Sequence, residues 1–150
     1  MVRTTISVLG AGAALALLAT AAPAAPAAPA ALERAGWTLV TSSDDTLVYM
    51  KPAPSPAPGA GKLRRVWTAY DSARDLRRGG LTFRSVKSLG EFDCARRMSR
   101  VLEETFHEAP ALQSEGRKIP GWIPTDWQPV EPGSVGAVRM AYACEATGET

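Results

Sequence analysis

Few side chains in this sequence of 150 residues are of the kinds that do chemistry. It contains two cysteines, Cys94 and Cys144, and one histidine, His107. Two thiols and one imidazole are too few for a closed zinc site, which needs four ligands. His107 borders an irregular, proline-rich segment, where we expect it at the surface rather than buried and oriented as a catalytic triad requires. We therefore predict that the protein is not an enzyme and has no catalytic residue, metal or cofactor.

Basic side chains form the other chemically distinctive group. Residues 62–100 contain eleven lysines and arginines against four acids, whereas residues 101–150 contain eight acids against three bases. One interpretation is that solvated strand faces neutralise each other in the fold. The other is a surface patch for a polyanion, such as a glycosaminoglycan, an acidic polysaccharide or an anionic membrane. The candidate patch comprises Arg64, Arg65, Arg84, Lys87, Arg96, Arg97 and Arg100.

Residues 1–31 have the composition of a signal peptide followed by an Ala/Pro leader. Arg3 precedes an uncharged apolar stretch at residues 6–19, which is too short to span a bilayer, and small residues then offer several cleavage positions. An uncleaved membrane anchor is the alternative. We expect cleavage, no remaining transmembrane segment and a periplasmic or secreted protein. We expect no lipid anchor, because no cysteine stands near the end of the apolar stretch. An exported protein rarely meets nucleic acid, so we expect no nucleic-acid partner.

The two cysteines therefore have a structural interpretation. They are 50 positions apart, and an exported chain with two cysteines is most simply interpreted as having one disulfide. A bond between Cys94 and Cys144 would hold the two ends of the core together. In the chain-entropy treatment, a closed loop of this length contributes roughly 4 kcal/mol to stability.

Runs of β-branched and aromatic residues, separated by turn and loop composition, predict four strands. These strands cover residues 37–41, 46–50, 63–70 and 81–89. The charged residues 71–80, which end in two glycines, are predicted to form a loop. In the third strand, Val66, Thr68 and Tyr70 should share one side. Residues 94–106 have apolar side chains at three- and four-residue spacing, which on periodicity alone favours an amphipathic helix over a strand.

The end of the chain predicts a covering loop followed by one helix. Residues 109–132 contain five prolines, and we expect their two tryptophans, Trp122 and Trp127, to cover an edge of the core rather than bind a ligand. Ser134 is a suitable N-cap for a helix that begins at residue 135. The helix should bury one apolar stripe, on which Cys144 could meet Cys94. The stripe comprises Ala137, Val138, Ala141 and Cys144.

The order and spacing of several motifs resemble the surface-adhesin E family of Gram-negative bacteria. The motifs are WxLV from Trp37, VWTAYD from Val66, FRSVK from Phe83, EFDC from Glu91, RVL from Arg100, TF from Thr105, WxPVxPGS from Trp127 and the terminal Cys144. The resemblance covers residues 36–144, which is nearly all of the expected mature chain.

This resemblance implies one α+β domain at residues 36–146. Its mainly antiparallel sheet of about six strands would be flanked by one C-terminal helix, which the disulfide ties to the sheet. The resemblance also makes the segment that starts at Cys94 a long strand, and we prefer this to the helix because tertiary context overrides local propensity. The founding members are adhesins that bind host extracellular-matrix and plasma proteins. A second copy of the chain, forming a homodimer, is a further expected partner.

Three features depart from the family pattern. The leader has no lipidation cysteine, the loop at residues 52–61 is rich in proline, and Ala137 stands where relatives often have a capping glutamate. The function we expect is that of an exported, non-catalytic binding module for an extracellular-matrix protein, a plasma protein or a polyanion. The alternative is a periplasmic structural or envelope-associated domain with no host partner.

Overall fold

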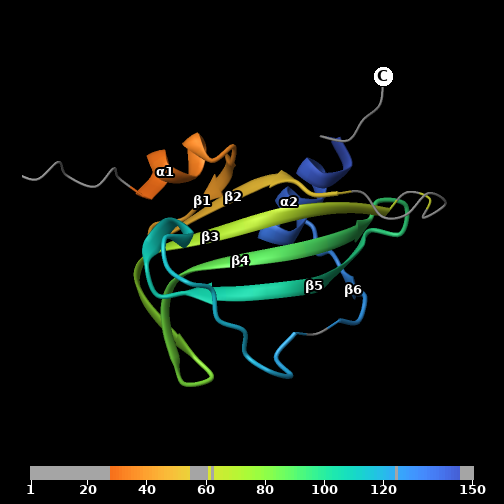
Figure 1. Cartoon of the computed structure of the whole chain (residues 1–150). Coiled ribbons are helices and arrows are strands. Elements are labelled where there is room, and N and C mark those ends of the chain that lie inside the picture. The colour runs from red at the N-terminus through yellow and green to blue at the C-terminus, as the bar shows by residue number, and fades with distance from the viewer. Residues whose placement is uncertain (1–27, 55–60, 62, 124, 146–150) are drawn as a thin grey trace, which may run out of the picture.

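Six strands form one antiparallel sheet in which neighbours in the chain are neighbours in the sheet (Figure 1). The strands are β1 (Thr38–Ser42), β2 (Thr46–Pro52), β3 (Leu63–Arg78), β4 (Leu81–Asp93), β5 (Met98–His107) and β6 (Gln128–Pro129). This computed structural model describes residues 28–54, 61, 63–123 and 125–145. The predicted signal peptide lies outside the described residues. The predicted α+β class, the sheet and the helix at the end of the chain are confirmed.

The charged residues 71–80 belong to a long β-hairpin, so the predicted loop is wrong. β3 continues to Arg78 and β4 begins at Leu81, and Gly79 and Gly80 make the turn with φ angles of 51° and 76°. Glycine adopts such positive φ angles without the steric cost that a side chain would add. From Ala73 onward the side chains of β3 are exposed, and the hairpin projects past the rest of the sheet (Figure 1). Backbone pairing forms this arm, and its charged side chains remain in water.

β5 confirms the strand implied by the family over the helix favoured by periodicity. It pairs with β4 from Asp93↔Met98 to Ser85↔His107, and these pairs occupy the backbone groups that a helix would have satisfied internally. Contrary to the prediction, Cys94 does not start this strand. It lies in the turn before it, where the Asp93 carboxylate accepts hydrogen bonds from the amides of residues 95 and 96 at 3.1 and 2.9 Å.

The alternation of side chains along the strands divides the sheet into two faces. On one face lies the helix α2 (Val135–Glu145), and the short helices α1 (Ala28–Arg34) and η1 (Pro110–Leu112) cover one end of the other. The core under α2 contains Met50, Val66, Phe92, Val130, Met140 and Ala143. The core under α1 and η1 contains Leu32, Trp37, Tyr49, Ala69 and Ala111.

The helix α2 begins at the predicted cap but turns a partly different side toward the core. The Ser134 hydroxyl accepts a hydrogen bond from the Ala137 amide at 3.1 Å. Of the predicted stripe, Ala137 and Cys144 pack against this core, whereas Val138 and Ala141 are exposed, so the prediction is half right. Met140 and Ala143 are the buried residues of the helix. Cys144 remains partly buried beside this core.

The predicted disulfide is confirmed. Cys94 and Cys144 are bonded, with their Cα atoms 6.0 Å apart, so the bond joins the β4–β5 turn to the last turn of α2. Neither cysteine is therefore a free thiol.

A short helix precedes the predicted domain, which we placed at residues 36–146. α1 begins at Ala28, inside the predicted leader, and its Leu32 is only 2% exposed. Leu32 packs in the same cluster as Trp37 and Tyr49. Composition concealed this helix because alanine-rich sequence suits a leader and a helix equally. Where the leader is cut remains a prediction.

Candidate functional site: a cationic sheet face

The register of the sheet brings basic side chains from four strands to the face opposite α2. Arg65 of β3 pairs with Glu91 of β4, which pairs with Arg100 of β5. Lys51 of β2 pairs with Trp67, two positions from Arg65 and on the same side. We call this region the cationic face. It comprises Lys51, Arg65, Lys87 and Arg100, the tryptophans Trp37, Trp67 and Trp127, and Glu91.

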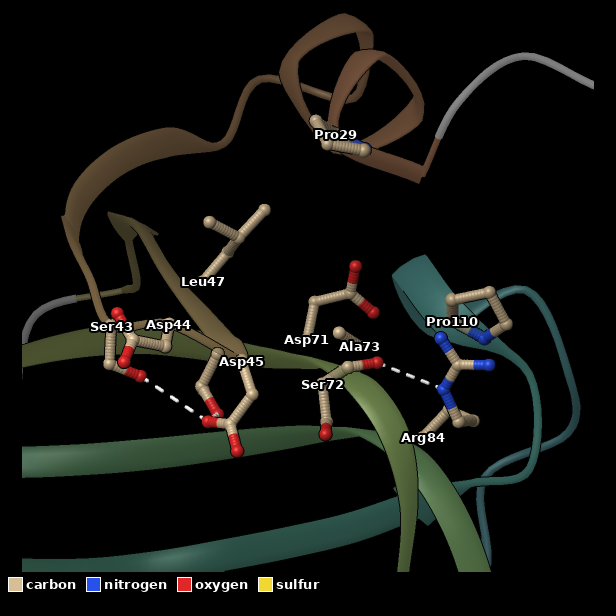
Figure 2. Close-up of a pocket in the computed structure, with 11 residues that line it drawn as sticks. Pro29, Ser43, Asp44, Asp45, Leu47, Asp71, Ser72, Ala73, Arg84 and Pro110 are labelled. Carbon is tan, nitrogen blue, oxygen red and sulfur yellow. Dashed lines mark hydrogen bonds between the residues drawn. The ribbon is translucent and has the colours of Figure 1, made fainter.

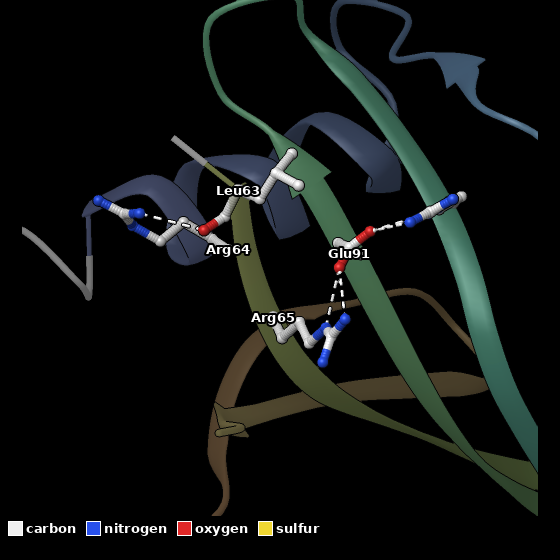
Figure 3. Close-up of polar contacts among 5 residues, drawn as sticks. Leu63, Arg64, Arg65 and Glu91 are labelled. Carbon is white, nitrogen blue, oxygen red and sulfur yellow. Dashed lines mark hydrogen bonds and ion pairs between the residues drawn. The ribbon is translucent and has the colours of Figure 1, made fainter. Parts of the chain in front are cut away.

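A buried carboxylate fixes the two arginines of this face. The Glu91 side chain is 1% exposed, and those of Arg65 and Arg100 are 34% and 32% exposed. Arg65 Nε donates to Glu91 Oε1 at 2.9 Å (Figure 3), and Arg100 Nε donates to Oε2 at 2.8 Å. Each arginine adds a second contact to the same oxygen, at 2.9 and 2.5 Å. Each carboxylate oxygen thus holds one guanidinium, and the outer edges of both reach solvent.

Tryptophan rings hold three of the four cations. Lys51 Nζ lies 4.8 Å from the centroid of the Trp37 ring, and Lys87 Nζ lies 4.1 Å from that of Trp67. The Arg100 guanidinium lies 4.6 Å from the centroid of Trp127. Such contacts are attractive because the face of the ring carries negative charge density. They also limit the rotamers of the long basic side chains, so the positive charges occupy defined positions.

The predicted patch is not one surface. Arg65, Lys87 and Arg100 lie on the cationic face, whereas Arg64 points to the other side of the sheet, away from Glu91 (Figure 3). Arg84 lies toward the other end of β4 and donates to the Ser72 carbonyl at 2.9 Å.

Arg96 and Arg97 also lie apart, in the β4–β5 turn. Arg96 is 3.7 Å from the Asp93 carboxylate, and the Arg97 carbonyl accepts from the Val130 amide at 3.0 Å. The sequence did not indicate that Lys51, Trp37 and Trp127 would join the face, because that depends on strand register and on the path of the loop before β6. One signal was available for Lys51. It lies two residues after Tyr49, so both side chains extend from the same side of β2.

A pocket of about 350 Å³ lies at the end of the sheet covered by α1 and η1 (Figure 2). Its polar groups are largely used within the protein. The buried Asp71 carboxylate accepts from the Ala111 amide at 2.7 Å, and Asp45 forms an ion pair with Arg74. Asp71 thereby attaches η1 to β3, which is a structural role.

His107 is buried, so the predicted surface position is wrong. Its Nδ1 lies 2.7 Å from the Ser114 carbonyl and its Nε2 lies 3.2 Å from the Thr105 hydroxyl. With both ring nitrogens engaged, His107 holds the loop after β5 against the strand. In the described residues no cluster of three or more His, Cys, Asp or Glu side chains is arranged to hold a metal ion.

Glu104 is half-buried on the other face of the sheet, the face that carries α2. It lines a pocket of about 310 Å³ with Tyr70 and Arg78. Burial raises the pKa of the Glu104 carboxyl, and the positive charges of Arg78 and Arg139 offset part of this rise. Burial also raises the pKa of the Tyr70 hydroxyl.

We expect Glu104→Gln to raise the melting temperature by a few degrees at pH 7 but not at pH 3. Because the pKa is higher in the folded state, the carboxyl favours folding most below its unfolded pKa, and this contribution is lost as the pH rises through the folded pKa. The amide is neutral throughout and avoids the loss. Thermal unfolding at both pH values measures the difference. Glu103→Gln removes the same charge from an exposed neighbour as a control, and an equal gain in both variants would contradict the assignment.

The fold and this face together define a small, disulfide-bonded α+β domain with an open, positively charged sheet surface. The sequence matches the surface-adhesin protein E family over residues 37–145. The chain belongs to this family, as its motifs suggested. No match is found among curated proteins.

Two solved structures of Haemophilus influenzae protein E are similar to this chain. Crystal form II has a TM-score of 0.58 at 11% sequence identity, with 77% of this chain and 92% of that chain covered. The other has a TM-score of 0.53 at 11% identity, with 78% and 91% covered. At this identity the likeness shows a shared fold.

Neither helix α1 nor helix α2, nor any other helix in the described residues, is long and apolar enough to cross a membrane.

Proposed function

We propose that this protein is an exported, non-catalytic adhesin that binds an extracellular partner through the cationic face. Membership of the surface-adhesin protein E family supports the class. The choice of surface rests on the four cations that are fixed on this face. Apart from α1 and η1 at one end, no described helix covers the face (Figure 1). The partner would be a host extracellular-matrix or plasma protein or an acidic component of the matrix. A homodimer also remains a prediction.

A periplasmic, envelope-associated domain with no host partner is the second candidate. It is favoured by the cysteine count, because the sequence has two cysteines and both are in the disulfide. Neither can therefore carry a lipid that would anchor the protein at the surface.

Protease shaving of intact cells, combined with fractionation, tests the proposal. An adhesin should be degraded by added protease or recovered from the medium, and the purified protein should bind immobilised matrix or plasma proteins. A periplasmic protein used as a control should stay intact. Confinement of this protein to the periplasm, with no binding to matrix or plasma proteins, would overturn the proposal in favour of the second candidate.

A further inference from the structure

We infer that the cationic face binds an extended acidic polysaccharide, a carboxylated or sulfated chain that lies across β2 to β5. This inference rests on the proposed function and specifies the chemistry of its ligand. The ligand must be anionic to complement the face, long enough to reach cations on four strands, and polar enough to dock without an apolar anchor.

The charge balance of the face favours an anionic ligand. Glu91 is shared between Arg65 and Arg100, so these three side chains retain one positive charge. Lys51 and Lys87 have aromatic partners, which leave their charges uncompensated. Further carboxylates extend from the strands on this side of the sheet. Glu103 lies 3.5 Å from Lys118 of the following loop, and Asp71 is buried under η1, where it accepts from the Ala111 amide. A net positive potential over a protein surface raises the local concentration of anions.

The spacing of the cations favours an extended ligand. Lys51 on β2 and Arg100 on β5 are three strands apart, which at the usual strand separation is about 14 Å. Glu91 is in register with Arg65 and Arg100, and Lys87 lies four residues from it on β4. Along a strand this separates Lys87 from the two arginines by about 13 Å. One small anion could not contact cations distributed over such an area, whereas a chain with repeated charges can contact several.

The apolar groups of the face argue against a protein partner. Binding hot spots between proteins are usually aromatic or aliphatic side chains that insert into a pocket. Among the described residues the exposed large apolar side chains are Leu39, Leu76, Trp122, Val135 and Val138. One of them, Leu39, lies on the same side of β1 as Trp37, and a single exposed leucine on the edge strand does not make the cluster of apolar anchors that such hot spots need.

The tryptophans of the cationic face argue against a nucleic acid as the ligand. Single-stranded nucleic acids bind by stacking bases on free aromatic rings, in addition to phosphate contacts. On this face the rings of Trp37, Trp67 and Trp127 carry a lysine or arginine instead. What the face offers to a ligand is fixed positive charge, held ready before binding, which lowers the cost of ordering the side chains.

The test uses the double variant Lys51→Gln, Lys87→Gln, which removes two fixed cations and leaves the Glu91 contacts intact. The control, Arg77→Gln with Arg117→Gln, changes net charge equally at two exposed positions outside the face. Binding of heparin oligosaccharide, neutral dextran and a single-stranded oligonucleotide is measured by calorimetry at two salt concentrations. Circular dichroism checks that both variants are folded.

We expect the face variant to bind heparin about tenfold more weakly, the control to bind as the wild type does, and binding to weaken as salt rises. Equal losses in both variants, or equal affinity for the oligonucleotide, would overturn the inference in favour of general charge attraction. Binding of glycan-free matrix proteins without heparin binding would overturn it while the proposed adhesin function stands. Absence of all binding by a protein confined to the periplasm would overturn both.

Discussion

Replacing Cys94 and Cys144 together by alanine is expected to lower the free energy of unfolding by about 4 kcal/mol. The disulfide joins residues separated by 50 positions, and its main effect in the chain-entropy treatment is to restrict the unfolded chain. A loss of this size is a large fraction of the stability of a small domain, which is about 5–15 kcal/mol. Urea unfolding of the double variant and the wild type, followed by circular dichroism, measures the difference.

The native fold should nevertheless survive in this variant without denaturant. α2 is also held by Met140 and Ala143, which pack in one core with Phe92, and by the Ser134 cap. Treatment of the wild type with a reductant should reproduce the loss, and the same treatment should leave the double variant unchanged. A decrease below about 1 kcal/mol would contradict the chain-entropy account, since the closed loop alone predicts more.

The features predicted correctly from the sequence were those with local or pairwise causes. Two cysteines allow one pairing, and Ser134 caps α2 through a bond to an amide three residues away. The family resemblance supplied β5, for which local periodicity gave the wrong answer. β5 is a strand because it pairs with β4, and the local pattern of apolar side chains does not show this pairing.

The candidate site was less predictable because it depends on strand register. Arg64 and Arg65 are adjacent in sequence, but they extend from opposite faces of β3 since side chains alternate along a strand. Grouping the bases by sequence position therefore mixed two faces. Lys51 joins the site because it pairs with Trp67, and Trp127 joins it because the loop before β6 returns to β5. Those contacts follow from the assembled sheet.

Glu91→Gln is expected to lower the free energy of unfolding by about 2–3 kcal/mol, because Glu91 is the buried anion on which both arginines depend. Removing one partner of a fully buried ion pair costs about 3–5 kcal/mol. Arg65 and Arg100 are each about one-third exposed, so water compensates part of the loss and the expected value is lower. Glutamine keeps the size of the side chain but has one acceptor oxygen and one amino group. One of the two guanidinium groups would then face a donor instead of an acceptor.

Glu103→Gln is the matched control, since it removes the same charge from the next strand of the same face. The Glu103 side chain is 43% exposed and lies 3.5 Å from Lys118, and exposed pairs of this kind contribute at most about 1 kcal/mol. The two variants should also differ in their response to salt. Salt screens exposed pairs but reaches buried ones much less, so the loss in Glu91→Gln should persist at high salt while any loss in Glu103→Gln disappears. Equal losses in urea unfolding at low salt, or a loss at Glu91 that salt abolishes, would mean that the carboxylate does not hold the two arginines in place. The fixed geometry of the cationic face would then need another source.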